Sequence, residues 1–134
     1  MNANPVFSLH IPTRILFGCG EIKKLATEIL PGKKAMIIIS GGTSMKKYGY
    51  LDKVTSFLTE NDVASIVYDK ILPNPIKSHV MEAAAICREQ GCDFIIGLGG
   101  GSTIDSAKAI AVMACNDGDF WNYVTGGTGK GRPV

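Results

Sequence analysis

An unbroken run of five apolar residues, residues 35–39, limits what this chain can fold into more than any other feature. Three of the five are isoleucines, and β-branched residues favour strands. A strand that is apolar on both faces is typical of a parallel sheet with helices packed on each side. The run therefore predicts an α/β protein in which residues 35–39 form an interior strand.

Segments with helical and strand-like patterns alternate along the chain. Apolar residues recur at helical spacing over residues 21–30, 48–61, 77–90 and about 103–114. Strand patterns cover residues 35–39, 65–68 and 94–98. This alternation predicts a doubly wound, mainly parallel sheet, in which ligands bind at the carboxyl ends of the strands. Two short alternating runs at residues 7–10 and 14–17 predict a small N-terminal β-hairpin.

Composition narrows the class of protein and of partner. A length of 134 residues with 46% apolar residues fits one domain, residues 1–134. A formal net charge of +2 is too small to indicate a nucleic-acid partner, so we expect a small-molecule ligand. The four cysteines match no metal-ligand spacing, and we expect reduced thiols in a cytoplasmic protein. No apolar run approaches the roughly 18 residues that span a bilayer, so we expect no membrane segment.

A glycine-rich turn follows the predicted strand 94–98. Its residues Gly99, Gly100, Gly101 and Ser102 lead into the last predicted helix. Glycines let backbone N–H groups approach an anion closely, and a helix N-terminus adds unpaired donors and the positive end of its dipole. We expect this turn to bind the phosphates of a dinucleotide. The alternative is a tight turn that needs its glycines only for packing.

Ser102 and Asp105 have the spacing of a helix capping box. On that interpretation the Ser102 hydroxyl caps the helix N-terminus. The same hydroxyl could instead donate a hydrogen bond to a phosphate, so the two interpretations compete for one atom.

A second glycine cluster, Gly41, Gly42, Thr43 and Ser44, follows the predicted strand 35–39. Doubly wound folds often contact the adenosine ribose at this place, through a carboxylate when the cofactor is NAD. Here the segment has no acid, and two lysines follow it that would suit the 2′-phosphate of NADP. We therefore expect NADP, with NAD as the alternative. The lysines could also be ordinary solvated residues.

Two prolines enclose Asn74 after the predicted strand 65–68. Each proline restricts its own φ and the conformation of the residue before it, so the loop is expected to be rigid. That rigidity could hold Asn74 against a ligand. The same residues also make an ordinary structural turn.

Several of these segments together resemble one family, the iron-containing (group III) alcohol dehydrogenases, which are related to dehydroquinate synthase and glycerol dehydrogenase. The resemblance covers nearly the whole chain. It is carried by residues 12–18 (PTRILFG), 73–75 (PNP) and above all 92–111 (CDFIIGLGGGSTIDSAKAIA). Residues 7–17, 41–44 and 119–123 (DFWNY) look most like the NADPH-dependent butanol dehydrogenase and aldehyde reductase branch.

The resemblance implies a Rossmann-like N-terminal domain and roles for the residues already named. Gly100, Gly101 and Ser102 would contact the pyrophosphate, and residues 41–44 would surround the ribose. Asn74 would line the adenosine side. Asp105 would lie near the nicotinamide end, with helix capping as the alternative.

The resemblance also implies an activity: the interconversion of small alcohols and aldehydes with a nicotinamide cofactor and iron or zinc, in a homodimeric protein. The family pattern continues with a TTAGTGSE segment and a helical domain that carries one aspartate and three histidine metal ligands, and this chain contains neither. We therefore expect no metal site and no catalytic residue here, and no turnover by the chain alone. The alternatives are a non-catalytic dinucleotide-binding fragment and a relative of glycerol dehydrogenase.

Overall fold

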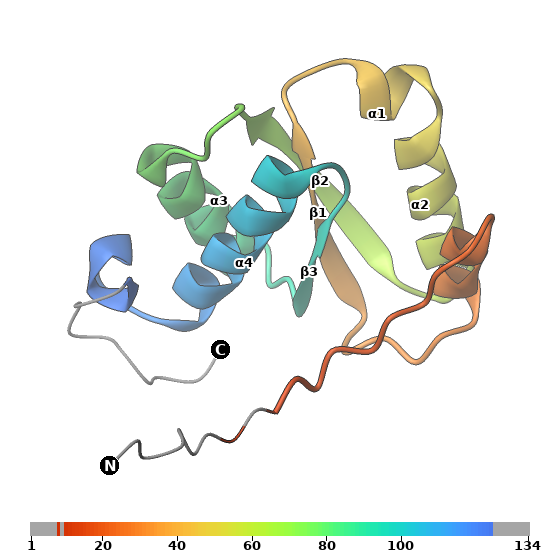
Figure 1. Ribbon diagram of the computed structural model, residues 1–134, viewed down its shortest axis with the longest axis horizontal. Coiled ribbons are helices and arrows are strands. Elements are labelled where there is room, and N and C mark those ends of the chain that lie inside the picture. Colours follow the sequence, from red (N-terminus) through yellow and green to blue (C-terminus); the bar gives the residue numbers. More distant parts are fainter. Residues whose placement is uncertain (1–7, 9, 125–134) are drawn as a thin grey trace, which may run out of the picture.

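A parallel three-stranded sheet in the order β2-β1-β3 forms the centre of the molecule. The structure, a computed structural model, describes residue 8 and residues 10–124. Its strands are β1 (Lys34–Ser40), β2 (Ala64–Ile71) and β3 (Phe94–Gly97). The predicted α/β fold with a parallel sheet is confirmed, and the apolar run lies in the central strand (Figure 1).

Helices cover both faces of this sheet (Figure 1). On one face, α3 (Lys77–Glu89) packs against α4 (Gly101–Cys115), which also contacts β3. On the other face, α2 (Tyr50–Glu60) packs beside the 3₁₀-helix η1 (Glu21–Ala26). Two short elements complete the described fold, namely α1 (Ser44–Lys47) and the 3₁₀-helix η2 (Phe120–Tyr123).

The apolar run of β1 is buried along its whole length, since each of its five residues is 0% exposed. Met36 and Ile38 belong to a core cluster with residues of β2, α3 and α4. Ala35, Ile37 and Ile39 belong to a second cluster with residues of α2. Successive side chains of a strand point to opposite faces, so burial on both faces explains why the run is continuously apolar.

The predicted N-terminal β-hairpin is wrong in the described part of the chain. Residues 8 and 10–17 contain no strand, and the rest of the predicted run 7–10 lies outside the described residues. The side chains of Ile15 and Phe17 are 78% and 96% exposed, so they do not pack on a core here. A two-stranded hairpin is marginal without a packed face, which explains the difference.

The helix predicted over residues 21–30 is shorter than expected. It is the six-residue η1, which ends at Ala26 because the β-branched Thr27 leaves the helical conformation with a φ of −132°. Ile22 and Leu25 pack against the second core cluster, as their spacing predicted. Ile29, predicted on the same face, is 100% exposed.

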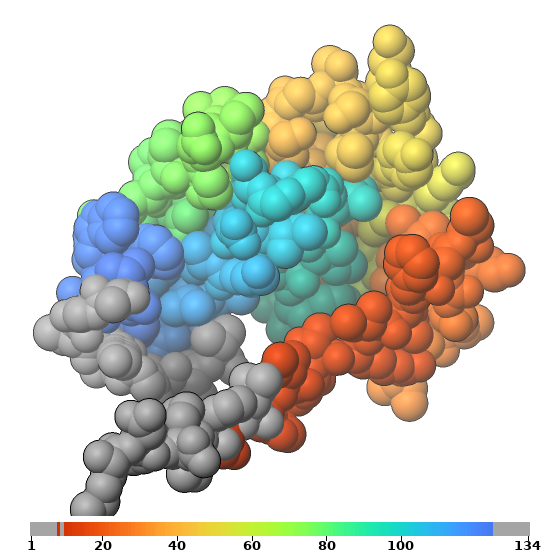
Figure 2. All heavy atoms as spheres, in the orientation of Figure 1, coloured from red at the N-terminus to blue at the C-terminus, as the bar shows by residue number. Residues whose placement is uncertain are grey.

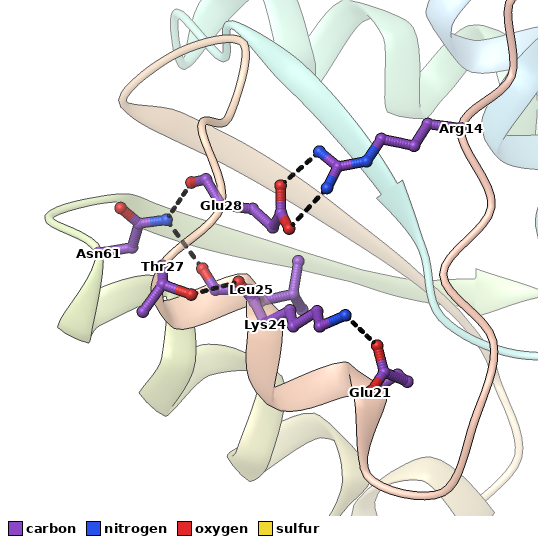
Figure 3. A network of polar contacts seen from close by, with 7 residues as sticks. All are labelled: Arg14, Glu21, Lys24, Leu25, Thr27, Glu28 and Asn61. Carbon is purple, nitrogen blue, oxygen red and sulfur yellow. Dashed lines mark hydrogen bonds and ion pairs between the residues drawn. The ribbon is translucent and has the colours of Figure 1, made fainter.

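A network of polar contacts holds the segment that follows η1 (Figure 3). The Arg14 guanidinium contacts both carboxylate oxygens of Glu28, at 2.6 and 3.1 Å. The side-chain amide of Asn61 donates to the carbonyl oxygens of Leu25 and Glu28, each at 2.8 Å. These bonds tie the N-terminal segment to the end of α2.

The helix predicted over residues 48–61 is interrupted at its start. Gly49 adopts a left-handed conformation with a φ of 71° and separates α1 from α2. Val54 and Leu58 of α2 are buried, as the spacing predicted. The remaining helices and strands differ from the predicted ranges by at most three residues at either end.

We predict that truncating β1 on either face destabilises the fold by a similar amount. Ile37→Ala and Ile38→Ala each remove a side chain that is 0% exposed, and each should lower the free energy of unfolding by about 2–5 kcal/mol. Val67→Ala, on β2 at 42% exposure, should lower it by less than about 1 kcal/mol. Urea denaturation followed by circular dichroism measures all three. A large loss at only one of the two isoleucines would contradict a core on both faces.

Candidate functional site

The carboxyl ends of the three strands lie at one edge of the sheet, because the strands are parallel (Figure 1). Three segments predicted to bind a ligand start there: residues 41–44 after β1, residues 73–75 after β2 and residues 99–102 after β3. The Gly41 N–H donates to the Ile71 carbonyl at 2.8 Å, and the Leu98 N–H donates to the Ile38 carbonyl at 2.9 Å. These bonds extend the strand pairing to the start of the loops.

The glycine turn leads into α4 and leaves the first backbone donors of the helix free. Gly100 is the N-cap residue, and its carbonyl accepts from the N–H groups of Thr103 and Ile104 at 3.0 and 3.1 Å. Within the described residues, nothing accepts from the N–H groups of Gly101 and Ser102. Free N–H groups at the positive end of a helix dipole form an anion-binding surface.

Gly99 is required by the fold itself. Its φ is +154°, a value that side chains rarely adopt. A Cβ atom there would lie 2.8 Å from Thr103 Oγ1 and 3.1 Å from Thr103 Cβ. Because Thr103 is only 3% exposed, it has little room to move away. For this glycine, packing is a sufficient explanation.

Gly100 and Gly101 are in a different situation. A Cβ atom at either position would have no neighbouring atom within 4 Å, and neither residue has a positive φ. The packing of the described chain therefore gives no reason for glycine at these two positions. Open space over free backbone N–H groups is what the close approach of an anion requires.

The Ser102 hydroxyl does not cap the helix. Ser102 lies inside the first turn of α4, and the N-cap residue Gly100 has no side-chain capping bond. Asp105 is exposed and pairs with Lys108 at 3.2 Å. The capping interpretation is therefore wrong for both residues. No group in the described part of the chain bonds to the half-buried Ser102 hydroxyl, which leaves it available to a ligand at the turn.

The loop after β1 is exposed and carries hydroxyl groups. A Cβ atom on Gly41 would lie 3.3 Å from the Asp69 carbonyl oxygen, so this glycine lets the loop pass close to β2. Gly42, Thr43 and Ser44 are all exposed. Thr43 is the N-cap residue of α1 and makes no side-chain capping bond, so its hydroxyl is not used by the helix.

An acid that the sequence interpretation missed lies beside this loop. The Lys46 ammonium binds the Asp69 carboxylate at 2.5 Å, and this hydrogen bond lowers the pKa of Asp69. Asp69 follows Lys46 by 23 positions, and the pairing of β1 with β2 brings the two together. Lys47 pairs with no carboxylate in the described chain, and its ammonium lies 5.8 Å from the centre of the Tyr48 ring.

Asn74 has an unusual backbone conformation between its two prolines. Its φ is +61°, in the left-handed region, which few residues other than glycine and asparagine adopt. Its side chain is exposed, in the loop that follows the carboxyl end of β2. The rigidity expected from the two prolines stays a prediction.

The described residues contain no group of three or more His, Cys, Asp or Glu side chains that could hold a metal ion. None of the described helices combines the length and the apolar character that crossing a membrane needs. What this edge of the sheet offers to a ligand is anion binding by N–H groups, hydroxyls and a lysine.

Comparison with known proteins identifies the family of this chain. Residues 12–134 match the model of the family described as iron-containing alcohol dehydrogenase. The probable NADH-dependent butanol dehydrogenase 1 of Bacillus subtilis is 40% identical over 119 residues, which are 89% of this chain and 31% of the relative. The NADPH-dependent aldehyde reductase YqhD of Escherichia coli is 44% identical over 108 residues, 81% of this chain and 27% of the relative.

A solved structure shares the fold as well. The NADH-dependent butanol dehydrogenase A of Thermotoga maritima superposes with a TM-score of 0.81 at 37% identity, over 87% of this chain and 30% of that protein. The chain thus spans less than a third of the length of these relatives. On the match of residues 12–134, this chain belongs to the iron-containing alcohol dehydrogenase family.

Proposed function

We propose that this chain is the dinucleotide-binding part of an alcohol dehydrogenase or aldehyde reductase that interconverts small primary alcohols and aldehydes, with NADP(H) as its cofactor. The observation that carries the proposal is the open turn at Gly100 and Gly101, where packing does not require glycine. A pyrophosphate is the kind of anion that such a turn binds when a helix N-terminus follows it.

Each loop at the strand ends is assigned one part of the dinucleotide. Gly99 shapes the turn, and the N–H groups of Gly101 and Ser102 and the Ser102 hydroxyl donate to the pyrophosphate. The loop 41–44 surrounds the adenosine ribose. Asn74 lines the adenosine side. Asp105, exposed on the first turns of α4, lies toward the nicotinamide.

The chain's own residues bind and orient the cofactor in this proposal. A bound nicotinamide supplies or accepts the hydride. Because the described residues contain no group of side chains that could hold a metal ion, we assign them no metal-binding role. We also propose no catalytic residue among them. Iron or zinc would be held by the part of the family polypeptide that lies outside the matched region.

The choice of NADP rests on charge around the loop after β1. The loop carries no acid, and Lys47 has no carboxylate partner among the described residues. Asp69 weakens the preference for NADP. Its carboxylate pairs with Lys46, so a 2′-phosphate would have to compete with Asp69 for this lysine. The relatives do not decide the question, since their names include both NADH-dependent and NADPH-dependent enzymes.

A second candidate function is dinucleotide binding without turnover. The lack of a metal-binding group in the described residues favours it. Both candidates require the cofactor to bind at the glycine turn, so binding is the property to measure first.

We predict that the purified chain binds NADPH more tightly than NADH. Titration with each cofactor, followed by nicotinamide fluorescence, measures both dissociation constants. NADPH should be favoured because a lysine and two hydroxyls, rather than an acid, follow β1. Failure of both cofactors to bind would reject the phosphate-binding turn, and tighter binding of NADH would reject the choice of NADP.

Alanine at neighbouring glycines should have unequal effects on stability. Gly99→Ala should lower the free energy of unfolding by about 1–3 kcal/mol, because it strains φ and collides with Thr103. Gly100→Ala should lower it by less than about 1 kcal/mol, because a Cβ there meets open space and the remaining cost is that alanine is a poorer N-cap residue than glycine.

The same Gly100→Ala variant should weaken cofactor binding at least about tenfold, a loss of about 1.4 kcal/mol, because its methyl group keeps the phosphate away from the turn. Urea unfolding and calorimetric titration measure the two properties separately. If the Gly100→Ala variant binds the cofactor as tightly as the parent chain, the proposed contact between the turn and the pyrophosphate is wrong.

We also predict that Asp69→Asn tightens NADPH binding by about two- to fivefold and leaves NADH binding unchanged. The substitution frees Lys46 for the 2′-phosphate, and the effect is small because Lys46 and Asp69 are 52% and 44% exposed. Asp52→Asn, an equal change of charge at an exposed position of α2, is the matched control. An equal gain for NADH, or the same gain in the control, would show a general charge effect instead.

A further inference from the structure

The end of α3 is closed by a Schellman motif that carries a cysteine at each of its outer positions. Gly91 adopts a left-handed conformation with a φ of 62°, and its N–H donates to the Arg88 carbonyl at 3.1 Å. The next N–H, that of Cys92, donates to the Cys87 carbonyl at 3.0 Å. The side chains at these two outer positions commonly make an apolar contact in such a motif. The helix end therefore brings two thiols together.

The two thiols interact directly. Burial raises the pKa of both, and the pKa of Cys87 rises to about 11. The Cys87 S–H also donates a hydrogen bond to the Cys92 sulfur, which raises the pKa of Cys87 further and opposes the effect of burial on the pKa of Cys92. Neither cysteine is in a disulfide. At neutral pH the pair therefore consists of two protonated thiols in contact.

A groove gives a small molecule access to this pair. Cys87 is 3% exposed and Cys92 is partly exposed, and both line an apolar groove of about 520 Å³ beside α4 and β3. Figure 2 shows α4 (cyan to blue) and the teal β3 region next to each other at the surface. Ala111 and Ala114 of α4 also line the groove. These small side chains leave room next to the thiols.

The thiol pair lies away from the candidate dinucleotide site. Cys92 comes just before β3, whereas the glycine turn, residues 99–102, follows the carboxyl end of that strand. The neighbouring Asp93 carboxylate accepts from the N–H groups of Lys33 and Lys34 at the start of β1, at 2.7 and 2.9 Å. The pair is thus at the amino ends of the strands, and a ligand there would not compete with a dinucleotide at the carboxyl ends.

The protonated state of the pair decides which chemistry suits it. Disulfide formation needs an oxidant and proceeds through a thiolate, which a raised pKa makes scarce. A metal ion also needs deprotonated sulfur, and the described residues contain no group of three ligands for one. A hydroxide of trivalent arsenic reacts differently, because each thiol hydrogen leaves with an arsenic-bound hydroxyl group as water. This condensation requires no net loss of a proton to solvent.

We propose that Cys87 and Cys92 form a chelating site for trivalent arsenic, bound as arsenous acid or as an organic arsenical with two hydroxyl groups. Two As–O bonds break, two As–S bonds form, and two water molecules leave, while arsenic stays trivalent. The backbone of the helix end holds the two sulfurs together before arsenic arrives. Binding by the pair should therefore exceed binding by one thiol by about 100- to 10,000-fold.

Phenylarsine oxide, which is a dihydroxide in water, is the probe for the 134-residue chain. Native mass spectrometry should show one phenylarsenic group bound per chain, with two thiol hydrogens lost. Ethanedithiol should remove the group, and the same concentration of mercaptoethanol should not, because one thiol cannot replace a chelate. A chain that takes up no phenylarsenic group, or that releases it equally to the monothiol, would overturn the proposal.

Alkylation of the unchanged chain identifies the sulfurs that hold arsenic. The complex is unfolded in urea and treated with iodoacetamide, and the modified cysteines are located by peptide mass spectrometry. Cys19 and Cys115, which are exposed, should be alkylated, whereas Cys87 and Cys92 should be protected. Without the arsenical all four cysteines should react. Protection of any other pair would overturn the assignment.

Two variants compare cysteines of the same groove. Cys92→Ser removes one sulfur of the proposed chelate and should weaken binding at least about 100-fold in a calorimetric titration. Cys115→Ser is the matched control, since Cys115 also lines the groove, and it should leave binding unchanged. Unchanged binding by Cys92→Ser, or equal weakening in both variants, would overturn the proposal. Circular dichroism shows whether each variant is folded, and if Cys92→Ser is not, the alkylation pattern of the parent chain decides.

Discussion

The burial of β1 on both faces is the interaction on which the rest of this structure depends. Five consecutive residues without solvent exposure require helices on each side of the sheet, and the two core clusters divide those five residues between them. Parallel pairing on both sides of β1 then brings three strand ends to one edge. The candidate site is a consequence of that packing, since its three loops begin where the strands stop.

The glycine turn combines two requirements that the sequence pattern presents as one. Gly99 satisfies the fold, because any side chain would meet Thr103. Gly100 and Gly101 leave open space in front of free helix N–H groups, which suits a phosphate and does nothing for packing. In the described residues the turn is therefore partly required by packing and partly open, and the two parts can be separated by mutation.

Strong, continuous patterns predicted the fold well. The interior strand, the parallel order and the long helices α2, α3 and α4 follow from apolar spacing, because burial on one or two faces demands it. The short patterns were less reliable. The alternating residues 14–17 have no partner strand in the described chain, and Ile29 falls outside the helix that its spacing suggested.

The sequence by itself determined the class of fold, the glycine turn and the family resemblance, because these depend on residues close together along the chain. Only the tertiary structure decided that Ser102 has no capping role, that Asp69 binds Lys46, and that β1 is the central strand of the described sheet. Each of these depends on the order of strands in the sheet or on where a helix begins. Local spacing gives a helix start only to within a few residues and says nothing of strand order, since strand pairing joins residues that are distant in the sequence.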